Sequence, residues 1–209
     1  MRPLYSSLQT SQGLTIRPIL KDYEMLPRLK EIVGSTPTVP EENWICCPHI
    51  QRDILHKNLM YYIEKDPWPI PATEDREAYH GDRHLEWWCS GLLSVLEIER
   101  LYQKYSQPIK DNDVFFELGC STGRILRHAA FQSACKLKTW GCDINARSVG
   151  WVQQFLPKNL VVFQNTALPT LPLPDNSVDI ITGCSIFTTL MILKVRGLWS
   201  CRVSSSLPV

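Results

Sequence analysis

A short segment near the middle of the chain combines an acidic residue with two glycines at a spacing suited to ligand binding. It runs from Val114 to Arg124 with the sequence VFFELGCSTGR. Its β-branched and aromatic start predicts a buried strand. Gly119 and Gly123 let the backbone turn sharply and approach a ligand closely. The start of a helix behind this loop, which Ser121 and Thr122 are expected to cap, offers free N–H groups to an anionic group such as a carboxylate.

A second acidic residue stands where a nucleoside would be bound. Asp143 ends a predicted strand, twenty-six positions after Glu117. In nucleoside-binding α/β folds, an acid at this place accepts hydrogen bonds from the ribose hydroxyls. The alternative is an acid that complements the dipole of the following helix. The glycine loop upstream favours ribose binding.

A third segment, Leu171–Ile181 with the sequence LPLPDNSVDII, completes a series of motifs. Glu117 followed by G-x-x-x-G resembles the first motif of class I S-adenosylmethionine-dependent methyltransferases, in particular domains of type 11 or 25. The third segment resembles the L-P-x-P-D-N-S-F-D stretch that opens the fourth strand of the same family, where Asp175 and Asp179 are expected to be structural. The resemblance spans Asp113 to Leu190. The loop lacks the G-x-G-x-x-G spacing of dinucleotide-binding proteins, which disfavours an NAD-dependent oxidoreductase.

The resemblance implies S-adenosylmethionine as the cofactor and assigns roles to individual residues. Glu117 and the two glycines would cradle its methionine part, Asp143 would hold the ribose and Ile144 would lie against the adenine. The family usually has an Asp after the third strand, but this chain has Asn165 and Thr166 there, one of which would accept from the adenine amino group. The cofactor-binding residues implied are Glu117, Gly119, Cys120, Gly123, Asp143, Ile144, Asn165, Thr166 and Cys184, the last bordering the methyl group with Ser185.

The sequence nominates no catalytic residue and no metal site. His80 and His84 are candidates for a general base if their segment folds over the cofactor, and the alternative is a helix cap with surface histidines. They are also four residues apart, but no third ligand is evident, and the Cys46–His49 segment fits no closed four-ligand zinc site. Cys120 is expected to be a small side chain tolerated near the cofactor and not a nucleophile.

Hydrophobic periodicity predicts a helical N-terminal part followed by alternating strands and helices. Helices are expected at Leu20–Val33, Gln51–Ile63, His80–Tyr105, Thr122–Ser133 and Asn145–Phe155, the last capped by Asn145. Strands are expected at Val114–Leu118, Lys138–Asp143, Leu160–Gln164 and Val178–Gly183. The fold class is therefore α/β: a Rossmann-like, doubly wound parallel sheet of about four strands with an N-terminal helical extension.

The expected organisation is a mostly helical extension or cap over residues 1–106, a cofactor-binding core over 107–190 and an atypical tail over 191–209. Trp68, Trp87 and Trp88 of the extension line a substrate pocket or, as the alternative, belong to the core. The later strands of the family are missing from the sequence, which predicts a C-terminally shortened enzyme or a partner chain that completes the sheet.

Composition narrows the class of protein further. The 209 residues carry a net charge of +1, with scattered basic residues, so no nucleic-acid partner is predicted. No stretch has the length of a membrane span, and eight cysteines without C-x-x-C pairs favour a reducing, cytoplasmic location.

The leading hypothesis is an enzyme that methylates O or N of a small molecule. The alternatives are a non-catalytic remnant that serves in cofactor binding or interactions, and, third, the oxidoreductase.

Overall fold

The structure is a computed structural model that describes residues 28, 29, 31, 59–76, 80–167, 170–184 and 186. Most of the helix predicted at Leu20–Val33, the first part of that predicted at Gln51–Ile63, and the tail over 191–209 lie outside these residues. Among the described residues, 59–64 are helical, in agreement with the end of the second predicted helix.

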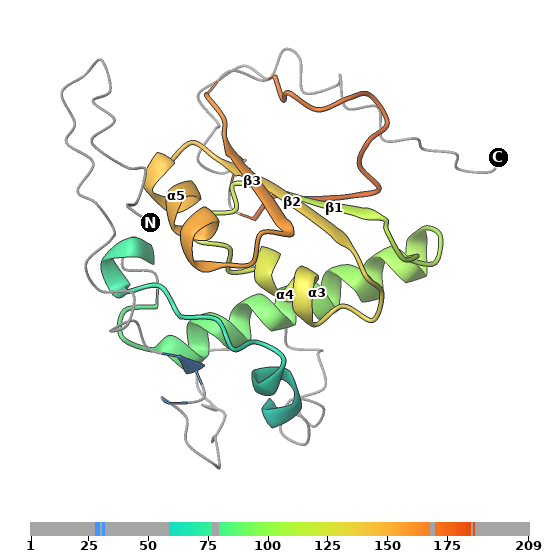
Figure 1. Cartoon of the computed structure of the whole chain (residues 1–209). Helices are drawn as coiled ribbons and strands as arrows, with labels where there is room; N and C mark the ends of the chain where they lie inside the picture. The colour runs from blue at the N-terminus through green and yellow to red at the C-terminus, as the bar shows by residue number, and fades with distance from the viewer. Residues whose placement is uncertain are drawn as a thin grey trace.

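Four parallel strands form the centre of the molecule (Figure 1). Their order across the sheet is β3-β2-β1-β4, which is the start of a doubly wound order with a switch point between β1 and β4. The predicted fold class is thereby confirmed. Three strands have the predicted bounds, whereas β4 is shorter than predicted. The strands are β1 (Val114–Leu118), β2 (Lys138–Asp143), β3 (Leu160–Gln164) and β4 (Ile180–Thr182).

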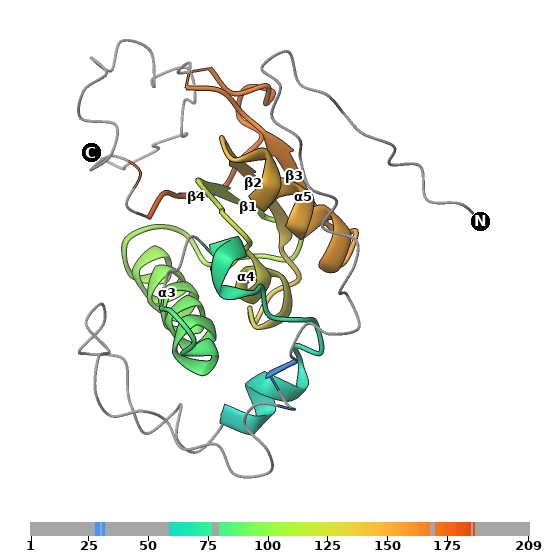
Figure 2. The ribbon, with the colours of Figure 1, turned by 90° about the vertical axis from the view of Figure 1, so that its left-hand side faces the viewer.

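The helices cover one face of this sheet (Figures 1 and 2). The connections from β1 to β2 and from β2 to β3 run in the same direction, so right-handed crossovers place α4 and α5 on the same side. The N-terminal helix α3 packs against α4, and the short 3-10 helix η3 packs against α5. The helical elements are η3 (Thr73–Arg76), α3 (His84–Tyr105), α4 (Leu126–Phe131) and α5 (Ala146–Phe155).

The structure confirms one predicted helix start and corrects two others. Asn145 caps α5, its side-chain oxygen accepting from the backbone N–H groups of the second and third residues of the helix. The helix predicted at Thr122–Ser133 begins only at Leu126, and neither Ser121 nor Thr122 caps it. The reason is the loop backbone, because φ is 45° at Ser121 and 79° at Gly123, which a right-handed helix excludes. Similarly, α3 begins at His84 because φ is positive at residues 80 and 81.

Two hydrophobic clusters form the core. One lies between the sheet, α4 and α5, with Phe115, Trp151 and Phe155 among its largest buried members. The other lies within the extension, joins residues 59–70 to α3 and includes Trp87 and Trp88, which are 2% and 0% exposed. These two tryptophans therefore belong to the core, as in the alternative predicted for them.

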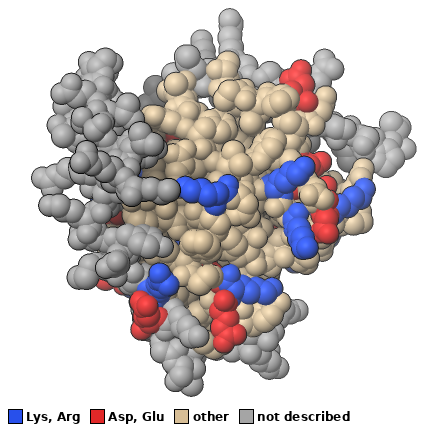
Figure 3. All heavy atoms as spheres, viewed as in Figure 1, with Lys and Arg blue, Asp and Glu red and all other residues tan. Residues whose placement is uncertain are grey.

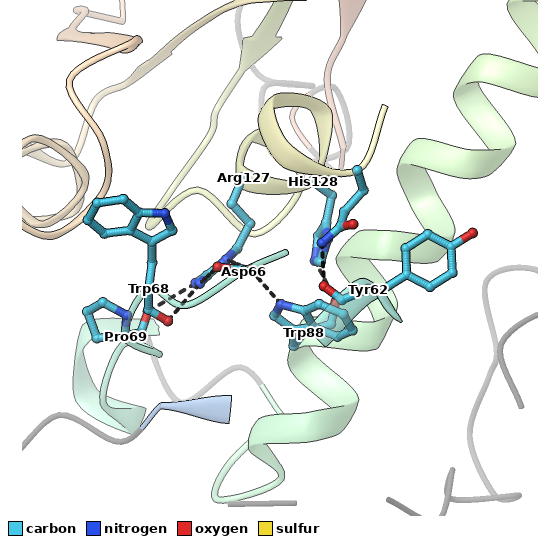
Figure 4. Close-up of polar contacts among 8 residues, drawn as sticks. Tyr62, Asp66, Trp68, Pro69, Trp88, Arg127 and His128 are labelled. Atoms are coloured by element: carbon cyan, nitrogen blue, oxygen red, sulfur yellow. Dashed lines mark hydrogen bonds and ion pairs between the residues drawn. The ribbon is translucent and has the colours of Figure 1, made fainter. Parts of the chain in front are cut away.

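A buried ion pair fastens the extension to α4 (Figure 4). Arg127 Nε and Nη2 donate to the two carboxylate oxygens of Asp66, each at 2.7 Å, and both side chains are fully buried. The same guanidinium donates to the carbonyls of Trp68 and Pro69, each at 3.1 Å, and Trp88 Nε1 donates to Asp66 at 2.7 Å. The charges are thus paired and surrounded by further hydrogen bonds, as buried charges require.

The pKa values of Asp66 and of the adjacent His128 reflect this buried environment. Burial opposes ionisation of Asp66, but the charge and hydrogen bonds of Arg127, with the Trp88 bond, hold its pKa below the usual range. Burial lowers the pKa of His128 to about 3, so this side chain is neutral and donates through Nε2 to the Trp88 carbonyl at 2.9 Å.

The surface shown in Figure 3 has basic and acidic side chains interspersed. Within the described part of the chain, no helix is long and apolar enough to cross a membrane.

Replacing Arg127 with Met is expected to lower the free energy of unfolding by about 3–5 kcal/mol, because it leaves the Asp66 carboxylate buried without its counter-ion. Urea denaturation followed by tryptophan fluorescence measures this. The matched control is Arg100→Met, which breaks an exposed pair with Glu97 and should leave the midpoint nearly unchanged. Equal effects of the two substitutions would show that the buried pair has no special role.

Candidate functional site

The residues predicted to bind a cofactor gather at one edge of the sheet. All four strands are parallel, so their carboxyl ends lie side by side, and the loops that follow them meet at that edge. The structure brings together the loop after β1, Asp143 at the end of β2, Asn165 after β3 and Cys184 after β4. Ser185 lies outside the described residues.

The loop after β1 is a tight turn held by β2. The backbone N–H groups of Gly119 and Cys120 both donate to the Cys142 carbonyl, at 2.8 and 2.9 Å. Gly119 has φ of 75°, and a Cβ atom there would lie 2.0 Å from Ile186 Cδ1. The positive φ disfavours any side chain at residue 119, and a Cβ atom there would also displace the end of the Ile186 side chain, which accounts for the first glycine of the motif.

Asp143 connects this loop to α5. Its Oδ2 accepts from the backbone N–H of Ser121 at 2.7 Å, and its Oδ1 accepts from the N–H of Asn145 at 2.8 Å. Each carboxylate oxygen has room for a second donor. The side chain is thus fixed in place by the backbone and still able to receive two hydroxyl groups.

Glu117 is a buried carboxyl with an oxygen that lacks a partner. The residue is 3% exposed, and its Oε2 makes no hydrogen bond. Burial raises its pKa to about 8, although the positive charge of Arg124 and a hydrogen bond from the Leu126 backbone oppose the shift. This buried oxygen is open to a hydrogen bond from a ligand or a water molecule.

A second acceptor without a partner lies after β3. The Oδ1 atom of Asn165 is buried and accepts no hydrogen bond, while its backbone N–H donates to the Asp143 carbonyl at 3.0 Å. Nearby, Gln164 Nε2 donates to the Ile144 carbonyl at 3.1 Å, and the Ile144 side chain is 62% exposed. Asn165 thus offers an acceptor and Ile144 an apolar surface, whereas Thr166 is exposed.

The two cysteines beside the loop are inert thiols. Burial, with the nearby carboxyls of Glu117 and Asp143, raises the pKa of Cys120 well above its usual range. The Cys120 side chain lies against Gly141, where a Cβ atom would be 3.2 Å from its sulfur. Burial also raises the pKa of Cys142 to about 11. A thiol that stays protonated is a poor nucleophile, in keeping with the packing role expected of Cys120.

Arg124 is a site residue that sequence reasoning missed. Its Nη1 donates to Ser90 Oγ of α3 at 3.1 Å, and its Nη2 donates to Cys184 Sγ at 3.8 Å. The α3 backbone comes very close here, since a Cβ atom on Gly91 would lie 2.1 Å from the Arg124 carbonyl oxygen. The signal available in the sequence was a basic residue directly after the second glycine of the motif.

The two histidines proposed as base or metal ligands have different surroundings. Nδ1 of His84 lies 3.1 Å from Arg76 Nη2, a cationic donor. Nε2 of His80 lies 3.4 Å from Ser90 Oγ, next to Arg124. Over the part of the chain that the structure describes, no three metal-ligating side chains gather in one place.

Residues 116–195 match the model of a family described as a methyltransferase domain. This range contains the glycine loop and the predicted cofactor-binding residues from Glu117 to Cys184. Over these residues the chain thus matches a methyltransferase domain, in agreement with the resemblance that the three sequence motifs gave, which implies S-adenosylmethionine as the cofactor.

Other similarities are partial. The beta subunit of acetyl-coenzyme A carboxylase carboxyl transferase from Agrobacterium fabrum is 32% identical over 82 residues, which are 39% of this chain and 24% of that protein. The chain thus spans about a quarter of the length of that relative. A S-adenosylmethionine-dependent methyltransferase from Aquifex aeolicus is 24% identical, with a TM-score of 0.37 over 47% of this chain and 53% of that one.

A phosphoethanolamine N-methyltransferase from Haemonchus contortus, in complex with phosphomonomethylethanolamine and S-adenosylhomocysteine, is 18% identical, with a TM-score of 0.35. The similarity covers 44% of this chain and 20% of that one. At TM-scores below 0.5, neither structural similarity extends to function, so the family match and the geometry of the site carry the assignment.

Replacing Glu117 with Gln is expected to make the fold more stable at pH 7.5 and little different near pH 4.5. Between the ordinary pKa of 4.5 and the folded value of about 8, the unfolded chain has lost a proton that the folded chain keeps, so stability falls as pH rises through this window. Glutamine removes that slope. Thermal unfolding at several pH values measures it, with Glu64→Gln, at an exposed helical position, as control. Parallel pH profiles of wild type and Glu117→Gln would contradict the expectation.

Proposed function

We propose that this chain, which carries a class I S-adenosylmethionine-dependent methyltransferase domain, binds that cofactor at the carboxyl edge of its sheet and transfers the methyl group to O or N of a small molecule. The residues proposed to hold it are those predicted from the sequence: Glu117, Gly119, Cys120, Gly123, Asp143, Ile144, Asn165, Thr166 and Cys184.

The observation that carries this proposal is a row of acceptors that match the donors of the cofactor. Asp143, with capacity for two more hydrogen bonds, lies between two buried oxygens without partners, Glu117 Oε2 and Asn165 Oδ1. The cofactor has a cationic methionine end, two ribose hydroxyls and an adenine amino group. An anionic or neutral acceptor therefore faces each of its three donor regions in the proposed orientation.

The chain contributes to the reaction by holding the cofactor and the acceptor in position. When bound, the cofactor supplies an electrophilic methyl group on its sulfonium sulfur. Gly119 allows close approach to the loop, Asp143 fixes the ribose, and Ile144 supports the adenine face. Cys184 and Arg124 lie where the acceptor would enter, next to α3. Alignment of an acceptor with the methyl group and exclusion of water supply the rate enhancement.

The proposed acceptor is a small molecule. On the face shown in Figure 3, the described surface has no run of charges of one sign, which supports a small acceptor over a polyanion. The location proposed is the cytoplasm, in keeping with the free thiols of the five described cysteines. A partner chain that pairs with the β4 edge of the sheet remains part of the proposal.

Calorimetric titration with S-adenosylhomocysteine is expected to give micromolar binding, and Asp143→Ala is expected to weaken it by about 1–3 kcal/mol, because the ribose hydroxyls lose their acceptor. Asp175→Ala removes an exposed carboxylate from a loop away from this edge and serves as control. Absence of binding by a chain shown to be folded would overturn the proposal and favour a non-catalytic interaction module.

Binding of S-adenosylmethionine near pH 7 is expected to release a proton from Glu117. With a pKa of about 8 in the empty site, this carboxyl is mostly protonated at pH 7, and a cationic ligand favours its ionised form. Affinity should therefore rise with pH up to about 8. Calorimetry in two buffers of different ionisation enthalpy measures the proton release, and Glu117→Gln should abolish it. Equal proton release by wild type and this variant would assign the proton to another group.

A further inference from the structure

A buried arginine in the extension has hydrogen-bond donors that no other group of the described chain accepts. Arg76 is the last residue of η3 and is 2% exposed. Its Nη2 donates to the Gly81 carbonyl at 2.6 Å and lies 3.1 Å from His84 Nδ1, with Thr73 Oγ1 at 3.4 Å. These acceptors account for both hydrogens of Nη2. The Nε and Nη1 atoms are also buried, and the N–H bonds of these two nitrogens have no acceptor.

Arg127 shows how this chain satisfies a buried guanidinium elsewhere. Its three nitrogens all have acceptors, and Asp66 supplies the counter-ion. The ring of Trp87 contacts both arginines, with its centroid 5.5 Å from the Arg76 guanidinium and 5.8 Å from that of Arg127. The two side chains thus share an aromatic neighbour, but only Arg127 has a carboxylate bound to it.

The charges around Arg76 suit one further negative charge. Burial lowers its pKa, while Asp82 and Glu74 raise it without forming an ion pair with it. Both carboxylates are exposed, so water and salt screen them. A guanidinium stays protonated in proteins, so Arg76 keeps its charge in a buried place without an adjacent counter-ion. A carboxylate carries the single charge that fits, whereas a phosphate dianion would add a second negative charge close to Asp82 and Glu74.

Arg76 is attached to the edge of the sheet at which the cofactor is proposed to bind. The preceding residue, Asp75, is buried and accepts from Arg147 Nε at 2.7 Å. Arg147 is the second residue of α5 and follows Asp143 by four positions. The 3-10 helix that carries Arg76 is therefore held against the start of α5, close to the proposed ribose site.

The turn that Arg76 holds leads to the acceptor side of the same edge. Gly81 follows His80, whose Nε2 lies 3.4 Å from Ser90 Oγ. Ser90 Oγ accepts from Arg124 Nη1 at 3.1 Å, and the other terminal nitrogen of Arg124 reaches the carboxyl end of β4. A continuous series of contacts thus connects Arg76 to the place where the acceptor is proposed to enter.

The surroundings of Arg76 leave a side from which a ligand can approach. Thr73 and Gly81, which both contact its guanidinium, are partly exposed. A Cβ atom built on Gly81 would have no atom within 4 Å, so the space beside this turn is open. A small anion that enters here has to displace only the groups that cover Nε and Nη1.

We propose that Arg76 is a specificity-determining residue that binds a carboxylate group of the methyl acceptor through Nε and Nη1. This inference rests on the proposed function and narrows its acceptors to carboxylic acids that also carry the O or N atom to be methylated. The carboxylate supplies the counter-ion that Arg76 lacks, as Asp66 does for Arg127, through charge-assisted hydrogen bonds. Arg76 holds the acceptor in place and takes no part in the bond changes.

The first test follows the arginine Nε–H groups by nitrogen-15 NMR in the full chain saturated with S-adenosylhomocysteine. Acetate is the probe, acetamide is its neutral counterpart, and chloride is the salt control. Acetate is expected to shift the Arg76 Nε–H proton downfield in a saturable way, because a charged acceptor joins a donor that had none. Acetamide and chloride should not do so. The Nε–H of Arg127, already 2.7 Å from Asp66, should stay unchanged.

The outcomes of this titration separate the possible sources of the anion. An unmoved Arg76 signal, equal shifts with acetate and chloride, or a stronger response to inorganic phosphate than to acetate would overturn the proposal. Displacement of acetate by S-adenosylhomocysteine would assign Arg76 to the carboxylate of the cofactor and would also overturn it. If acetate shifts the signal but S-adenosylhomocysteine does not bind to the folded chain, the proposed function is overturned and only an anion site stands.

The second test uses Arg76→Lys, which keeps the positive charge but lacks the fixed set of guanidinium donors. The matched control is Arg83→Lys, on the same turn, where the arginine is exposed and pairs with Glu86. Arg76→Lys is expected to bind acetate about 10- to 100-fold more weakly than the wild type, and Arg83→Lys to bind it equally well. Calorimetry should give the same affinity for S-adenosylhomocysteine in all three chains. Equal acetate affinity in Arg76→Lys and the wild type, or loss of S-adenosylhomocysteine binding by folded Arg76→Lys, would overturn the proposal.

Discussion

The fold depends on one ion pair whose two halves come from distant parts of the chain. Asp66 belongs to the extension and Arg127 to the helix that follows the glycine loop, and both are fully buried. Neither charge can be left alone in that environment, so the extension must pack on α4 for either to be tolerated. The carbonyls of residues 68 and 69 and the indole of Trp88 complete the shell of hydrogen bonds. Helix α4 is thereby fixed from outside the sheet, and its first residue lies three positions after Gly123.

This attachment matters because α4 is only six residues long. A helix of that length has little stability of its own and is held by its neighbours. The glycine loop before it has positive φ at three residues, which a longer right-handed helix would not permit. Support for the loop therefore comes from three sides: β2 through the Cys142 carbonyl, Asp143 through the Ser121 N–H, and the extension through Arg127 and Ser90. Gly119, Cys120 and Gly123, three of the proposed cofactor residues, sit on this supported loop.

Local sequence signals predicted the strands of the core and the residues proposed for the cofactor site, but not the contacts between distant segments that hold them in place. The bounds of β1, β2 and β3 follow from apolar strands between turn residues, and Asn145 from its capping chemistry. The late start of α4 was not predictable, because only the structure shows Ser121 in the left-handed region, which is uncommon for serine. The Asp66–Arg127 pair joins residues 61 positions apart, and no periodicity reports such a contact. For the same reason, the sequence did not distinguish His80 from His84. The structure distinguishes them, because His80 contacts Ser90 whereas His84 contacts Arg76.

The contact between Gly91 and Arg124 has a consequence for how this sequence can change. The carbonyl oxygen of residue 124 occupies the place of a side chain on residue 91, and that oxygen belongs to backbone, which no substitution at 124 can shorten. Any larger residue at 91 requires the whole start of α4 to shift, together with the loop before it. The middle of α3 and the glycine loop can therefore change only together. A chimera that takes the extension from a relative must take the glycine loop from the same relative or keep glycine at residue 91.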